Sequence, residues 1–160
     1  MKSVLLASAT FIFLLGIGFC SVPSMFNSKW EDSYALGKGL YMISIDHGKI
    51  VVQGSYVRDG ICYGGDYVVP LYEECYDSLG NVREYVVNAV ADEYAVMIKT
   101  FILDDKKYKY YLIDKTFDEK CVSNLQIRES FTYRFNSLQE LKAFCSQNNW
   151  ESILSSLADL

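Results

Sequence analysis

The amino-acid sequence predicts a mainly β protein: a strongly curved antiparallel sheet, a half-barrel or a barrel of about 8 strands, with one or two C-terminal helices. Runs rich in Val, Ile, Tyr and Phe alternate with short turn sequences, most clearly over residues 76–121. Apolar residues at helical spacing appear only near the C-terminus. Of the 160 residues, 51% are hydrophobic and 15% aromatic, which excludes a disordered chain and suits one domain with its own core.

Residues 1–20 have the features of a secretory signal peptide. Lys2 gives a positive start, residues 4–19 are apolar and uncharged, and Gly18 and Cys20 stand at the spacing that signal peptidase accepts. A transmembrane anchor is the alternative, but the apolar run is short and no basic flank follows it. The sequence therefore predicts cleavage near Ser21, a single secreted β-rich domain over residues 21–160 and an extracellular location.

The predicted strands follow one another at short intervals, separated by turn residues. The sequence DHGK at 46–49 forms the turn of a hairpin, and Gly64-Gly65 suggests a bulge or loop within the third strand. Residues 21–35 are interpreted as a short helix or an extended lead-in. The predicted strands comprise residues 40–45, 50–57, 61–69, 82–90, 94–103, 108–115 and 125–135.

Helices are predicted only after the last strand. Ser137 and Glu140 form a capping box, in which the two side chains reciprocally satisfy free backbone N–H groups of the first turn. Apolar residues then follow at helical spacing, at positions 138, 141 and 144 or 145, and again over 150–157. We expect both segments to pack against the sheet; a partner-binding helix is the alternative.

The three central strands are joined by turns short enough for hairpins, so we expect them to lie side by side. One parity of each strand then faces the inside of a curved sheet. Because an unpaired lysine is costly to bury, we assign the parity of Lys99 in one strand, and that of Lys109 and Lys115 in the next, to the outside. The residues predicted to line an apolar ligand pocket are then Tyr94, Val96, Ile98, Tyr108, Tyr110 and Leu112.

Four cysteines lie outside the signal peptide, and an even number in a secreted chain predicts two disulfides. More than one pairing is possible. We favour Cys62–Cys75 and Cys121–Cys145, because each pair would link neighbouring segments. No zinc site is predicted, since the sequence has no CxxC pair and His47 is its single histidine.

Two short blocks carry a resemblance to a known family. The run YDSLGNVR at 76–83, followed by YLID at 111–114 and Cys121, resembles the corresponding segments of ependymin-related proteins. This resemblance covers about a third of the chain. It implies a curved antiparallel sheet around a deep hydrophobic pocket, and it implies calcium near the acidic turns, although no EF-hand spacing is present.

A second resemblance is to the lipocalins. The sequence GLY at 39–41 is similar to their entry strand, ADEYAV at 91–96 is similar to one of their later blocks, and a C-terminal helix is shared. Both families imply a secreted β protein with an apolar ligand cavity.

Several functional classes are not expected from this sequence. The net charge is −5, without a basic stripe, so a nucleic-acid partner is not expected. His47 lies in a predicted turn without a partner for nucleophilic catalysis, and no glycine-rich phosphate loop is present, so no enzymatic activity and no cofactor are expected.

The 13 Tyr and 9 Phe favour an enclosed apolar cavity. The predicted function is therefore that of a secreted carrier or binding protein for a small hydrophobic ligand, such as a fatty acid or another lipid. The alternative is a secreted protein–protein interaction module that acts at a cell surface or modulates immunity, which an exposed apolar patch would favour.

Overall fold

The computed structural model describes residues 33–45, 48–55, 57–62, 64–148 and 150–155. The predicted signal peptide, His47 and Leu157 lie outside these residues. The strands of the main sheet are β1 (Tyr34–Gly37), β2 (Leu40–Ile45), β3 (Gly48–Gly54), β6 (Gly65–Val69), β7 (Glu84–Ala91), β8 (Ala95–Ile102), β9 (Lys107–Asp114) and β10 (Thr132–Phe135). A small hairpin is formed by β4 (Val57–Arg58) and β5 (Ile61–Cys62), and the helices are α1 (Tyr72–Cys75), α2 (Asn124–Ser130), α3 (Leu138–Gln147) and α4 (Glu151–Leu154).

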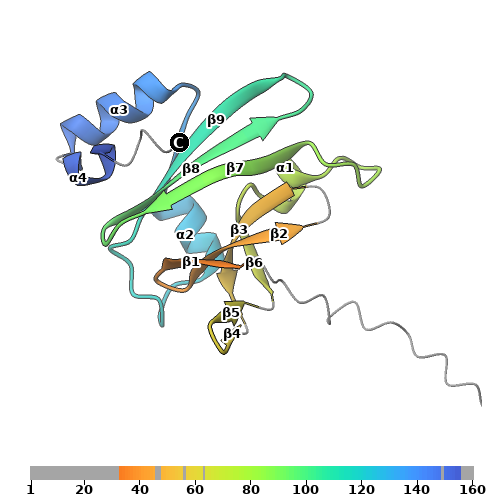
Figure 1. The fold of residues 1–160 in the computed structure, drawn as a ribbon, viewed down its shortest axis with the longest axis horizontal. Coiled ribbons are helices and arrows are strands. Elements are labelled where there is room, and N and C mark those ends of the chain that lie inside the picture. The colour runs from red at the N-terminus through yellow and green to blue at the C-terminus, as the bar shows by residue number, and fades with distance from the viewer. Residues whose placement is uncertain (1–32, 46–47, 56, 63, 149, 156–160) are drawn as a thin grey trace, which may run out of the picture.

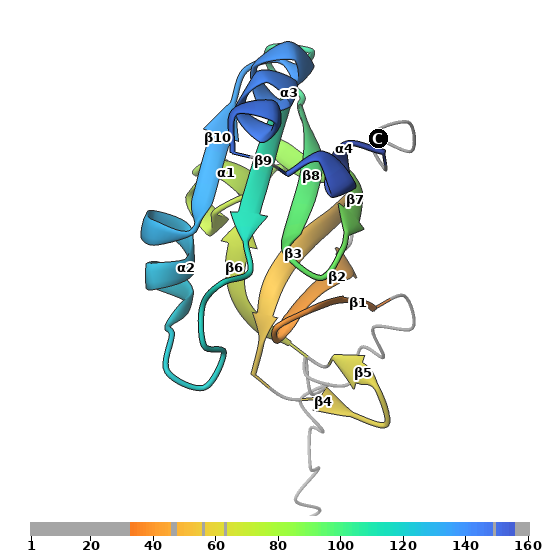
Figure 2. The ribbon, with the colours of Figure 1, turned by 90° about the vertical axis from the view of Figure 1, so that its left-hand side faces the viewer.

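The prediction of a mainly β protein with C-terminal helices is confirmed. The 8-stranded antiparallel sheet has the order β1-β2-β3-β7-β8-β9-β10, and β6 also pairs with β3 (Figures 1 and 2). The expected closure is wrong, because the sheet is neither closed nor strongly curled. After β9 the chain forms α2 and returns as β10 beside β9, so β1 and β10 end the path at opposite edges.

β3 is the junction between the two halves of the sheet. It pairs with β2 along its whole length. On its other side it meets β7 through the single pair Lys49↔Val86 and then pairs with β6 from Val51 onward. The approach to β6 requires a glycine, since a Cβ on Gly65 would lie 2.1 Å from the backbone oxygen of Gln53.

The sheet forms a middle layer with apolar side chains buried on both faces. On one face Val96 and Ile98 pack in a cluster with Ile127 of α2 and with residues of β2, β3 and β6. On the other face Ala95 and Met97 pack against α3 and α4, which lie along β8 to β10 in Figure 2. This arrangement explains why the first half of β8, residues 95–98, is continuously apolar instead of alternating.

The predicted strand over 125–135 is wrong in its first half, which is helix α2. Ser123 accepts a hydrogen bond from the backbone N–H of Gln126 (3.3 Å), and the Gln126 side chain accepts one from the Ser123 N–H (3.0 Å). This capping box starts the helix, and Ile127 then faces the core. The alternation of apolar residues is genuine only from Thr132, where β10 begins.

The first predicted C-terminal helix is confirmed as α3, with a different cap. Ser137 accepts from the Glu140 N–H (3.2 Å), as expected, but the Glu140 carboxylate accepts from the N–H of Asn136 instead of Ser137 (2.9 Å). α4 is short, and Ile153 is its buried residue. None of the described helices is long and apolar enough to cross a membrane.

All four described cysteines are free thiols in the structure. Cys62 and Cys75 belong to one buried cluster with Ile43, Ile50 and Val52. Cys121 is exposed beside Phe117 and Phe131, on the face of the sheet where α2 packs. Cys145 belongs to α3 and is buried between this helix and the opposite face of the sheet, so the sheet separates the two members of the second predicted pair.

We expect iodoacetamide to modify Cys121 in the folded protein and to leave Cys145 unmodified, because only the first of these thiols is exposed. Peptide mass spectrometry with and without prior reduction measures both labelling and pairing. The same maps test the Cys62–Cys75 disulfide. Recovery of a Cys121–Cys145 peptide before reduction would contradict the observed arrangement.

Candidate functional site

Two clefts lie on opposite faces of β7, β8 and β9, near the turn that joins β8 to β9. Side chains of consecutive strand residues point to opposite faces, so Glu84 and Tyr85 belong to different faces, as do Thr100 and Phe101. We call the two sites the charged cleft and the aromatic cleft.

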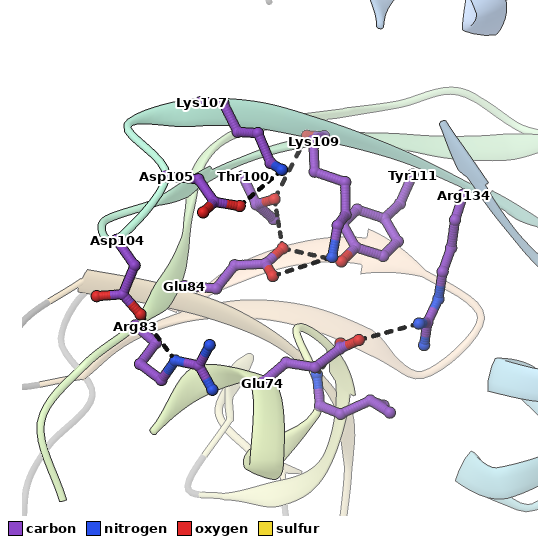
Figure 3. A network of polar contacts seen from close by, with 11 residues as sticks. Glu74, Arg83, Glu84, Thr100, Asp104, Asp105, Lys107, Lys109, Tyr111 and Arg134 are labelled. Carbon is purple, nitrogen blue, oxygen red and sulfur yellow. Dashed lines mark hydrogen bonds and ion pairs between the residues drawn. The ribbon is translucent and has the colours of Figure 1, made fainter. Parts of the chain in front are cut away.

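A buried carboxylate forms part of the wall of the charged cleft. Glu84 is only 3% exposed, and three side chains donate to it: Thr100 Oγ1 (2.6 Å), Tyr111 Oη (2.8 Å) and Lys109 Nζ (3.3 Å). Figure 3 shows these donors converging on the carboxylate from β8 and β9. Because the charge has several hydrogen-bonding partners, its burial is tolerated.

Ion pairs surround this carboxylate. Arg134 Nη1 lies 2.9 Å from Glu74 Oε1, Lys107 Nζ lies 2.6 Å from Asp105 Oδ2, and Arg83 Nε lies 3.1 Å from Asp104 Oδ2 (Figure 3). The charged cleft has a volume of about 290 Å³. It is lined by Glu73, Glu74, Arg83, Glu84, Ile102, Asp105, Lys107, Lys109 and Asn136.

Burial and neighbouring charge shift the proton affinities of nearby groups. Burial, followed by the charge of Glu84, raises the pKa of Tyr111 well above its usual value, so this phenol stays a hydrogen-bond donor. Burial also raises the pKa of the Cys75 thiol from 9.0 to about 11. Below pH 9 both groups are therefore neutral.

The aromatic cleft is built on a row of three rings from three strands. Tyr85, Phe101 and Tyr108 are cross-strand partners, with ring centroids 6.0 and 5.2 Å apart. A Cβ on Gly48 would lie 2.6 Å from the Tyr85 Cβ, so the glycine lets this tyrosine lie against β3. The cleft has a volume of about 380 Å³ and is lined by Gly48, Lys49, Tyr85, Val86, Val87, Phe101 and Tyr108.

One lysine lies at this aromatic row: Lys99 Nζ is 4.5 Å from the centroid of the Tyr108 ring. Lys49 also borders the cleft, but its pairing with Val86 directs its side chain to the opposite face of the sheet. Tyr108 is 46% exposed and Val87 40% exposed, whereas α3 and α4 cover the other end of the same face. The arrangement offers an apolar platform with positive charge beside it.

The structure divides the six predicted pocket residues between the two faces. Val96 and Ile98 are buried on the face of Tyr111, and Ile98 pairs directly with Tyr111 across the strands. Leu112 and Tyr110 lie on the opposite face, beneath α3 and α4. Tyr94 is 56% exposed just before β8 begins. Of the six, only Tyr108 lines either cleft.

The prediction that these residues of β8 and β9 share one face is wrong because the lysines in and after β9 do not avoid burial. Lys109 pairs with Glu84, and Lys115, only 6% exposed, donates to the backbone oxygens of Leu36 and Asp92. Both lysines therefore have partners on the face where Val96 and Ile98 are buried. Sequence reasoning missed Glu84 and Tyr85; their cross-strand partners become identifiable only once the strand register is known.

Within the described residues, no group of three His, Cys, Asp or Glu side chains gathers as a metal site. No family model, curated protein or solved structure matches the chain. The resemblances to ependymin-related proteins and lipocalins therefore stay predictions.

We expect Tyr111→Phe to lower the free energy of unfolding by about 1.5–3 kcal/mol, because it removes one donor to a buried charge. Urea denaturation measures the change. Tyr94→Phe is the matched control, since Tyr94 is exposed, and it should change stability by less than about 0.5 kcal/mol. Equal effects of the two substitutions would contradict the role of the Tyr111 hydroxyl.

The free energy of unfolding should fall as the pH rises from 9 to 11. The unfolded chain releases the Cys75 proton near 9.0, whereas the folded chain holds it until about 11. The folded state then binds more protons, so alkali favours unfolding. Cys75→Ala should flatten this part of the profile, and Tyr111→Phe should flatten the part above the usual tyrosine pKa. Profiles of both variants parallel to that of the wild type would contradict these assignments.

Proposed function

We propose that the protein binds a small amphipathic ligand in the aromatic cleft, with the apolar body of the ligand on the rings and a negatively charged head near Lys99. The observation that carries this proposal is the half-open row of Tyr85, Phe101 and Tyr108. Aromatic rings provide apolar contact area at low conformational cost, and Lys99, over the Tyr108 ring, supplies the charge that selects the head group.

A fatty acid or a similar lipid has this chemistry. In the extracellular location predicted from the signal peptide, the protein then acts as a carrier or scavenger, without turnover of the ligand. Covering about 150 Å² of apolar surface contributes about 4 kcal/mol before the cost of association is subtracted. An open cleft covers one side of its ligand, so we expect weaker binding than in an enclosed cavity.

Two fluorescent probes of similar ring structure test this proposal: anionic anilinonaphthalene sulfonate and neutral phenylnaphthylamine. We expect Phe101→Ala and Tyr108→Ala to weaken both probes by at least about tenfold, because each removes a ring from the platform. Lys99→Gln should weaken binding of the anionic probe alone, because it removes the charge that lies at the rings. Hexadecanoate should displace both probes from the wild type, as measured by loss of fluorescence.

Tyr94→Ala is the matched control, because it removes an exposed tyrosine outside the cleft. It should change probe affinity by less than about twofold. Unchanged probe binding by folded Phe101→Ala would exclude the aromatic cleft as the site. If the wild type bound neither probe nor hexadecanoate, the protein–protein interaction module would become the better proposal.

A further inference from the structure

We propose that the charged cleft is a second binding site, for a small organic cation with a primary ammonium group on a short alkyl chain. This proposal does not depend on the aromatic cleft, which lies on the other face of the same strands. It begins with the Glu84 carboxylate, which lines the charged cleft although the residue is only 3% exposed.

The hydrogen bonds of Glu84 leave room for one more donor. A carboxylate has about four acceptor positions, two on each oxygen. Oε1 accepts from both Thr100 and Tyr111. Within the described part of the chain, Oε2 accepts from Lys109 alone, at the longer distance of 3.3 Å. An ammonium group of a ligand fits the remaining position on Oε2 as a charged donor.

The charge balance of the lining also favours a cation. Four acidic residues line the cleft, namely Glu73, Glu74, Glu84 and Asp105, against the three basic residues Arg83, Lys107 and Lys109. Outside the lining, Asp104 pairs with Arg83 and Arg134 pairs with Glu74, so these two neighbours cancel and the excess of one negative charge remains. A bound cation therefore neutralises an excess of negative charge beside a buried carboxylate, where charge interactions are stronger than in open solvent.

Size and shape limit the ligand to a short chain. The volume of about 290 Å³ lies at the lower end of the range for small-molecule sites. Ile102 is the apolar side chain of the lining, and the Asn136 amide offers both a donor and an acceptor. A few methylene groups fit against Ile102 while the ammonium group reaches Glu84.

Butylammonium is the probe, with butanol and butyrate as neutral and anionic probes of similar size. We expect NMR titration of the wild-type protein to show saturable binding of butylammonium at least about tenfold tighter than that of the other two. Phe101→Ala should leave butylammonium binding unchanged, because this ring lies in the aromatic cleft.

Two substitutions at the ion pair of Glu84 and Lys109 should change the affinity for butylammonium in opposite directions. Glu84→Gln keeps the size of the side chain and removes its charge, so butylammonium binding should weaken by at least about tenfold. Lys109→Met removes the cation that contacts Oε2, so butylammonium should bind about tenfold tighter by replacing the lysine. Glu129→Gln removes the same charge from the exposed surface of α2 and is the control, with no change expected.

Absence of butylammonium binding by the wild type, or equal binding of butanol, would overturn the proposal. So would unchanged affinity in folded Glu84→Gln. If Glu84→Gln does not fold, Lys109→Met decides: unchanged or weaker binding in the folded variant excludes contact between the ammonium group and Oε2.

Discussion

The two-residue alternation of β7, β8 and β9 is the constraint on which both clefts depend. One register places Glu84, Thr100 and Lys109 on one face of the sheet and the residues next to them, Tyr85 and Phe101 among them, on the other. A shift of a strand by one residue would exchange its faces. It would move a buried carboxylate into solvent and an aromatic ring into the polar network. The two clefts therefore depend on the same strand register, and a shift would disrupt both.

The Glu84 network specifies that register more sharply than apolar packing alone. An apolar side chain at position 84 would pack acceptably against several neighbours, whereas a buried carboxylate needs its donors at hydrogen-bonding distance. Those donors come from two other strands: Thr100 from β8, and Lys109 and Tyr111 from β9. A single anion on β7 therefore aligns three strands. Any ligand donor that reaches Oε2 would add to an alignment that already exists.

Local patterns in the sequence predicted the fold class, the hairpins and the α3 cap at Ser137, because their causes lie within a few residues. Which side chains of β8 and β9 lie on which face depends on partners that are distant in the sequence. The rule that lysines avoid burial holds on β8, where Lys99 lies over Tyr108. It fails on β9 and directly after it, because Lys109 pairs with a residue 25 positions away and Lys115 donates to one 79 positions away. The Ser123–Gln126 capping box was a local signal for α2, but apolar alternation masked it.

The aromatic cleft opens where β3 changes its pairing partner from β7 to β6. β7 and β3 share only the pair Lys49↔Val86, after which β3 continues beside β6. The β7–β8 pairing shifts between Val86 and Asn88, and a bulge of this kind bends a strand and redirects its side chains. Val87, the residue at the bulge, lines the cleft and stays exposed. The cleft therefore forms because β3 and β7 separate after a single pair of residues. Because strands rather than loops carry its rings, the platform is held in place before any ligand arrives.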